Sequence, residues 1–136
     1  MVEMSGVYLG ELHCELTHGP SGNKIQTDAP KDNMGRGEAF SPTDLVGAAL
    51  GSCILTTMAI VATRDKVELK GSSFKVQKEM ATSTPRRIAS LNAQFKLPKS
   101  IPEDYKKKLE NVAHTCPVHR SLHPDIQMNM SFEYSV

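Results

Sequence analysis

The longest apolar stretch of the chain is an uncharged run that extends from Leu45 to Ala62. Three residues just before this run indicate the N-terminus of a helix. Ser41 can cap the helix, Pro42 fits the first helical position, and Asp44 lies three residues after Ser41, as in a capping box. We therefore predict a long central helix that begins at Ser41, and we interpret Asp44 first as a capping residue.

Small residues recur inside this run, with Gly47 and Gly51 at the spacing that packed transmembrane helices use. A membrane span is therefore one interpretation. The glycines, together with serine, threonine and alanine residues, dilute the apolar character of the run and favour a buried helix instead. The small residues would allow another backbone to approach closely, either that of a sheet or that of a second copy of the helix.

Alternation of apolar and polar residues predicts strands on both sides of the central helix. The expected strands are 7–16, 24–29, 74–80, 89–97 and 126–136. The first two are joined by a turn-rich loop over 18–23. Apolar residues at helical spacing from Tyr105 to Cys116 predict a second helix. The pattern indicates a single α+β domain over residues 1–136, in which an antiparallel sheet covers the long central helix. The apolar surface left over on this helix predicts a two-fold homodimer.

Composition narrows the functional classes. Sixteen basic and fifteen acidic residues give a net charge of +1 without long blocks of either sign, so no nucleic acid partner is indicated. The N-terminal residues lack the basic and apolar regions of a secretory signal, and we expect a cytoplasmic protein without a membrane anchor. Three cysteines in such a compartment indicate redox, catalytic or metal-binding thiols more than a disulfide framework.

Two of the cysteines stand out. Cys53 lies inside the uncharged run, and Cys116 begins the compact sequence Cys-Pro-Val-His-Arg, whereas Cys14 fits a packed strand position. A thiolate can attack a peroxide O–O bond, and a second nearby thiol can convert the resulting sulfenic acid to a disulfide. Cys53 lies eleven residues past Pro42, too deep in the helix for the helix dipole to stabilise a thiolate. A cation is needed, and Arg36 is the only arginine before Cys53.

A zinc site is the rival interpretation of the second cysteine segment. Its ligands would be His114, Cys116, His119 and His123, since all of these side chain types bind zinc. Prolines interrupt the segment and no second pair of thiolates is present, so we expect no metal. His119 and Arg120 are expected in the short turn after Pro117, where either could help Cys116 to ionise.

Two segments resemble the motifs of a known family. Residues 35–53, Gly-Arg-Gly-Glu-Ala-Phe-Ser-Pro-Thr-Asp-Leu followed by Gly-Ala-Ala-Leu-Gly-Ser-Cys, are similar to the first cysteine motif of the osmotically inducible protein C (OsmC) and organic hydroperoxide resistance family. Residues 114–122, His-Thr-Cys-Pro-Val-His-Arg-Ser-Leu, resemble its second motif. The resemblance covers nearly the whole chain.

The resemblance implies an intertwined homodimer with long central helices wrapped by sheets and with active sites at the dimer interface. It also implies thiol-dependent reduction of hydroperoxides, in which Cys53 attacks the peroxide and Cys116 resolves the sulfenic acid. Family members use an external thiol reductant, in some cases dihydrolipoamide or a lipoylated protein, so no bound cofactor is expected.

One position departs from the better-studied branches of the family, which carry a glutamate ten residues before the first cysteine to hold the arginine. This chain has Thr43 there. Asp44 or Glu38 could orient Arg36 instead. The alternative to a peroxidase is a non-catalytic dimer or a hotdog-like acyl-binding domain, which also wraps a sheet around a long helix. Such a domain would have no need of a second cysteine after a helix.

Overall fold

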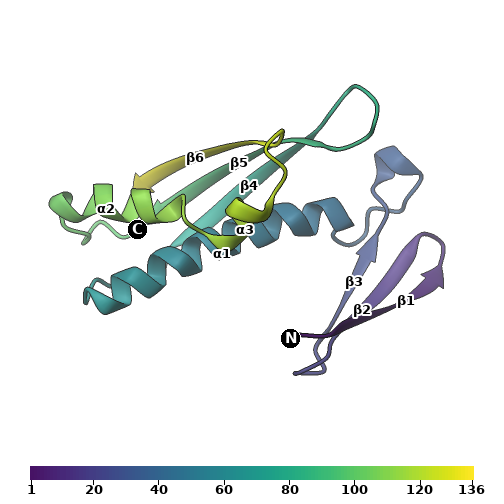
Figure 1. The fold of residues 1–136 in the computed structure, drawn as a ribbon, viewed down its shortest axis with the longest axis horizontal. Coiled ribbons are helices and arrows are strands. Elements are labelled where there is room, and N and C mark those ends of the chain that lie inside the picture. The colour runs from purple at the N-terminus through teal and green to yellow at the C-terminus, as the bar shows by residue number, and fades with distance from the viewer. The chain divides into compact units, whose positions relative to one another are not determined.

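The computed structural model describes all 136 residues and has the predicted α+β fold. The chain divides into two compact units, Met1–Val46 and Gly47–Val136. Each unit contains one three-stranded sheet, so the predicted strands are distributed over two sheets (Figure 1). The long helix α1 (Pro42–Arg64) begins in the first unit, and most of its length belongs to the second.

The first unit is built on an antiparallel sheet. Its strands, in the order β1-β2-β3, are β1 (Met4–Gly10), β2 (His13–His18) and β3 (Lys24–Asp28). The single strand expected over 7–16 is wrong, because β1 and β2 form a hairpin there. The turn residues Glu11 and Leu12 have φ angles of 52° and 60°, as both central residues of a tight hairpin turn require. The antiparallel register places Tyr8 opposite Cys14, so the apolar alternation continues across the turn.

A 3₁₀ turn, η1 (Lys31–Asn33), follows β3, and the chain then reaches the start of α1. The predicted capping box is present at this helix end. The Asp44 carboxylate accepts a hydrogen bond from the Ser41 N–H at 2.9 Å, and the Ser41 hydroxyl accepts one from the Asp44 N–H at 3.1 Å. The capping role of Asp44 is confirmed, and α1 begins where the sequence predicted.

The second unit contains the other sheet and two further helices. Its elements after α1 are β4 (Ser73–Met80), β5 (Ile88–Leu97), α2 (Glu103–Ala113), α3 (Pro117–Ser121) and β6 (Gln127–Tyr134). β4 pairs antiparallel with β5, whereas β6 pairs parallel with β5. The parallel pair corrects the expectation of an entirely antiparallel sheet. α2 and α3 lie between β5 and β6 in the chain, and a connection of this length allows β6 to run in the same direction as β5.

Within the second unit, α1 packs closely against β4 and β5. A Cβ atom added at Gly51 would lie 2.4 Å from the Phe74 ring, and one added at Gly47 would lie 3.4 Å from the side chains of Leu91 and Val76. The glycine stripe of α1 therefore faces the sheet, one of the two neighbours considered from the sequence. The apolar residues of α1 that are buried beside these glycines are Leu50, Ile54, Met58 and Ala62.

By length and composition, α1 is long and apolar enough to cross a membrane. A single helix of this kind is weak evidence for a membrane span, because the core helix of a soluble protein passes the same test. One side of α1, at Gly47 and Gly51, packs closely on the sheet, and 33% of its most apolar 18-residue window is buried.

Candidate functional site

The structure brings Cys53 and Cys116 together in the second unit. Cys53 lies on α1 and is half-buried, whereas Cys116 directly precedes α3 and is 0% exposed. The two side chains lie near each other, since the Cys53 thiol is one of the groups that raise the pKa of Cys116, and all three cysteines of the chain are free. The two cysteines singled out from the sequence thus form a reduced dithiol pair with one more accessible and one inaccessible member.

Cys116 does not belong to α2, so the expectation of one helix from Tyr105 to Cys116 is wrong. α2 ends at Ala113, and Cys116 has extended backbone angles, φ −61° and ψ 138°. Pro117 explains the break, because the residue before a proline is disfavoured in the helical region. Proline is also common as the first residue of a helix, which α3 shows here. This proline was the sequence signal for α3.

Cys116 caps α3 with its sulfur. Its Sγ accepts a hydrogen bond from the His119 N–H at 3.2 Å, as a serine oxygen would at such a position. His119 and Arg120 therefore lie on this short helix and not in a turn. The cap fixes the Cys116 sulfur beside α1, where it meets the Cys53 thiol.

The surroundings of the two sulfurs make them unequal. Burial raises the pKa of the Cys116 thiol, the backbone N–H of His119 opposes this rise, and the neighbouring Cys53 sulfur adds to it. Cys116 is consequently a protonated thiol at neutral pH. A negative charge on sulfur suffers a smaller loss of hydration at the half-buried Cys53 than at the fully buried Cys116. Burial therefore disfavours the thiolate form of Cys116.

The His119 side chain supplies no positive charge to this pair at neutral pH. Burial, and then the nearby charges of His114 and Arg120, lower the pKa of His119 below its usual value. Its ring meets that of His114 edge to face, with centroids 6.0 Å apart. Backbone N–H groups, those of His119 and Val118, and not the His119 imidazole, therefore stabilise negative charge on Cys116. No group of three or more His, Cys, Asp or Glu side chains is arranged to hold a metal ion.

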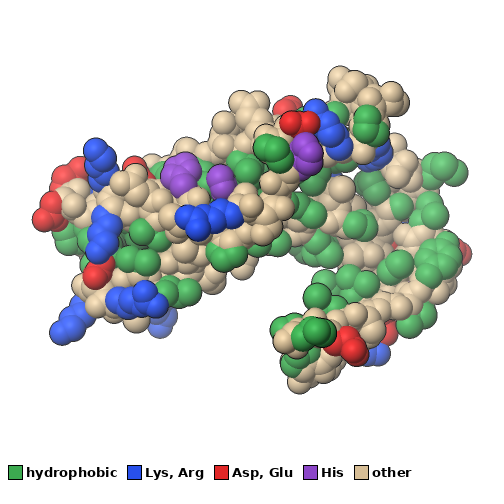
Figure 2. Space-filling view, in the orientation of Figure 1, with side chains coloured by type: hydrophobic (Ala, Val, Ile, Leu, Met, Phe, Trp, Pro, Cys, Tyr) green, Lys and Arg blue, Asp and Glu red, His purple; other side chains and the backbone are tan.

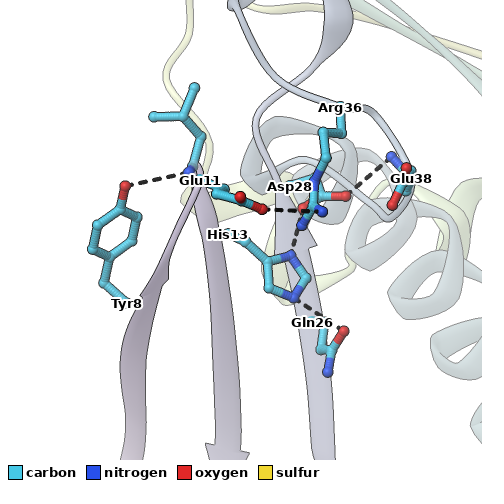
Figure 3. Close-up of polar contacts among 8 residues, drawn as sticks. Tyr8, Glu11, His13, Gln26, Asp28, Arg36 and Glu38 are labelled. Atoms are coloured by element: carbon cyan, nitrogen blue, oxygen red, sulfur yellow. Dashed lines mark hydrogen bonds and ion pairs between the residues drawn. The ribbon is translucent and has the colours of Figure 1, made fainter.

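Arg36, the third predicted site residue, belongs to the first unit and lies in the loop between η1 and α1. Its Nη1 atom is 3.3 Å from Oε2 of Glu11, the hairpin turn residue between β1 and β2 (Figure 3). From the sequence, Glu38 or Asp44 was the carboxylate expected to orient Arg36, and this stays a prediction. The ion-pair partner that the structure gives Arg36 is Glu11. Thr43, at the position of the family glutamate, has its hydroxyl 3.2 Å from that of Ser41.

A family model and a similar solved structure assign the chain to the same family. The model of the family described as OsmC-like protein matches residues 35–131. The structure of a protein from Psychrobacter arcticus 273-4, named for an osmotic stress induced and detoxification response, is 38% identical and covers 98% of this chain and 96% of its own, with a TM-score of 0.92. No curated protein matches the chain.

More distant structures show the same fold. An OsmC like protein from Mycoplasma pneumoniae is 16% identical, covers 100% of this chain and 98% of its own, and has a TM-score of 0.83. An organic hydroperoxide resistance protein OsmC from Legionella pneumophila is also 16% identical, with coverage of 98% and 96% and a TM-score of 0.78.

Proposed function

Because the chain belongs to the OsmC-like protein family, we propose that it is a cysteine-dependent peroxidase that reduces hydroperoxides and protects the cell against oxidative stress. The observation that carries this proposal is the proximity of the Cys53 and Cys116 thiols, through which Cys53 adds to the rise in the pKa of Cys116. A half-buried thiol next to a buried one is the arrangement that a two-cysteine peroxidase needs. The Legionella protein, named for organic hydroperoxide resistance, supports organic hydroperoxides as substrates.

In the proposed oxidative half-reaction, the Cys53 thiolate attacks the terminal oxygen of the hydroperoxide. The O–O bond breaks, an alkoxide leaves and takes a proton to become an alcohol, and Cys53 becomes a sulfenic acid. The Cys116 sulfur then attacks the Cys53 sulfur, and the hydroxyl group leaves with the Cys116 proton as water. The two thiols have supplied two electrons and are joined as a disulfide. A second thiol near the sulfenic acid favours this step over further oxidation.

The proposal gives Arg36 the role of the cation that supports the Cys53 thiolate. Cys53 is too far along α1 for the helix N-terminus to stabilise a negative charge. A guanidinium is charged at all relevant pH values and has several N–H donors, so it can also hydrogen-bond a peroxide oxygen. The first-motif resemblance and the ion pair with Glu11 support this role.

In the proposed reductive half-reaction, an external thiol reductant reopens the disulfide. Dihydrolipoamide or a lipoylated protein is the reductant that the family resemblance favours, and the protein needs no bound cofactor for this chemistry. The reductant attacks Cys53, because Cys116 is inaccessible. The leaving Cys116 sulfur is then received by the backbone N–H groups of Val118 and His119, which oppose the rise that burial causes in its pKa.

We further propose that the protein acts as a homodimer in the cytoplasm. β1–β3 expose many large apolar side chains, and hydrophobic residues recur over these strands in Figure 2. One face carries an open apolar groove of about 340 Å³, lined by residues that include Met4, Leu16 and Ile25. A contiguous apolar surface of this kind indicates a protein partner, and a second copy is the economical one.

The dimer is tested by light scattering across micromolar concentrations. We expect the mass of two chains throughout, because a subunit that exposes this groove would be destabilised when alone. A well-folded monomer under the same conditions would contradict the dimer.

The peroxidase activity is tested by mixing a catalytic amount of reduced protein with tert-butyl hydroperoxide and a molar excess of dihydrolipoamide. We expect many turnovers of hydroperoxide per protein, and slower turnover with a monothiol such as glutathione, since a dithiol completes the second exchange step within one molecule. Consumption no faster than in the protein-free mixture would reject the proposal and favour a non-catalytic or acyl-binding dimer.

A further inference from the structure

Asp28 is a buried carboxylate at the end of β3, with 1% of its surface exposed. A buried carboxylate needs hydrogen-bond donors for both of its oxygens. Oδ1 pairs with Nδ1 of His13 on the neighbouring strand β2, and Oδ2 accepts the backbone N–H of Glu38 at 3.0 Å (Figure 3). His13 is itself held through Nε2, 3.1 Å from the Gln26 side chain. One carboxylate therefore connects the sheet to the loop that carries Arg36.

The backbone of this loop is fixed on both sides of Arg36. A Cβ atom at Gly35 would lie 1.7 Å from the Ala29 carbonyl oxygen, so only glycine fits. Gly37 has a φ of 62°, in the left-handed region that favours glycine, and its N–H donates to the same Ala29 oxygen at 3.3 Å. The loop thus runs directly along the segment that follows Asp28, and the Arg36 backbone has little freedom.

Two carboxylates interact with the Arg36 guanidinium. Glu11 pairs with it directly, from a hairpin turn whose two residues adopt the left-handed conformation that L-residues rarely adopt. Asp28 is the second negative group. The hydrogen bond from His13 lowers the pKa of Asp28 most, burial opposes this effect, and the Glu38 N–H and the charges of His13 and Arg36 lower it further. Asp28 is therefore ionised at neutral pH.

We propose that Asp28 is a positioning residue for the peroxidase reaction: it ties the Arg36 loop, residues 35–38, to β2 and β3, so that Arg36 presents its guanidinium in one direction. Glu11 aligns the guanidinium itself. Together they perform the orienting task for which Thr43 provides no carboxylate. This inference rests on the proposed function, in which Arg36 supports the Cys53 thiolate.

The first arm of the test measures the loop alone, without reference to peroxide chemistry. Asp28→Asn keeps the shape of the side chain and removes its charge, whereas Asp28→Ala removes both oxygens. Glu15→Gln is the matched control, because Glu15 lies on the same sheet and pairs with Lys24 at 2.8 Å, away from the loop. We expect faster amide hydrogen exchange in the peptide containing Glu38, and faster tryptic cleavage after Arg36, in both Asp28 variants but not in the control.

The second arm measures Cys53 through a double-mutant cycle. Arg36→Ala should raise the pH midpoint for alkylation of Cys53, because loss of a neighbouring cation disfavours the thiolate. Asp28→Asn should raise this midpoint in the same direction and by a large part of the same shift. The double variant should match Arg36→Ala alone, since Asp28 acts through Arg36 and has nothing left to position once the guanidinium is gone.

Two results would overturn the inference. Loop exchange in Asp28→Asn equal to that of the parent protein would show that Asp28 does not hold the loop, and additive shifts in the double variant would show that it acts independently of Arg36. If Arg36→Ala leaves the alkylation midpoint unchanged, the positioning role in the reaction falls as well. If the Asp28 variants still loosen the loop in the first arm, the contact between Asp28 and the loop stands. The error then lies in the proposed role of Arg36.

Discussion

Cys53→Ser is expected to abolish consumption of hydroperoxide, whereas Cys116→Ser should retain a single turnover. Serine at residue 53 cannot form a thiolate, and the remaining buried Cys116 has a raised pKa that keeps it protonated. In Cys116→Ser, the half-buried Cys53 still attacks the peroxide, but no resolving thiol is present. Cys53 should therefore stop at the sulfenic acid and progress to the sulfinic acid under excess oxidant.

The measurement for this pair of variants is intact-mass spectrometry with and without a sulfenic acid trap, after one equivalent of hydroperoxide. Cys14→Ser is the control, because Cys14 lies on β2 opposite Tyr8 in the other unit and should change nothing. A first turnover that survives in Cys53→Ser and is lost in Cys116→Ser would reverse the assigned roles. Full activity in both variants would make the cysteines structural and favour the non-catalytic or acyl-binding alternative.

Gly51→Leu should strongly destabilise the fold. A Cβ atom at Gly51 would lie 2.4 Å from the Phe74 ring and 3.0 Å from the Val76 side chain, both on β4, so a larger side chain must displace the sheet from α1. Overpacking a core typically destabilises by about 1–3 kcal/mol, and leucine at this position should reach or exceed the upper end. The contact lies only two residues before Cys53 on α1, so loss of packing should also slow the reaction between Cys53 and Cys116.

Gly47→Ala is the control for Gly51→Leu, because it adds a methyl group on the same side of α1 where the structure leaves room for it. Its Cβ would lie 3.4 Å from the side chains of Leu91 and Val76, which is ordinary contact. Alanine in place of glycine inside a helix gains roughly 1 kcal/mol of helix propensity, so this variant should equal or exceed the parent in stability. Urea unfolding measures both free energies. Equal stability of Gly51→Leu and the parent would contradict the close packing described for α1.

The sequence predicted those features that depend on local chemistry. The capping box at Ser41 and Asp44 involves residues three apart in the chain, so its pattern alone was sufficient. The long α1 followed from its uncharged run, and the strands after it followed from alternation. The pairing of the two thiols was also expected, although through the family resemblance and not through any residue spacing.

Features that depend on long-range pairing were not predictable. The Glu11–Leu12 turn lacks the Asn-Gly or Asp-Gly signal of a tight hairpin, and the alternation continues through it, so one strand was expected where two exist. The parallel direction of β6 depends on where the chain returns after α2 and α3. Glu11, the ion-pair partner of Arg36, lies in that unrecognised turn. The pairing of β2 with β3 joins Asp28, which contacts the loop over residues 35–38, to His13.

The central claim is that Cys53 and Cys116 form one redox pair, and disulfide mapping tests it most directly. Fully reduced protein is mixed with one equivalent of an organic hydroperoxide, the remaining thiols are blocked, and the digested peptides are identified by mass spectrometry. The account predicts loss of two thiols per chain and a single linked species joining the Cys53 and Cys116 peptides, with Cys14 free and blocked. An unchanged count of three thiols, or a linkage that involves Cys14, would contradict it.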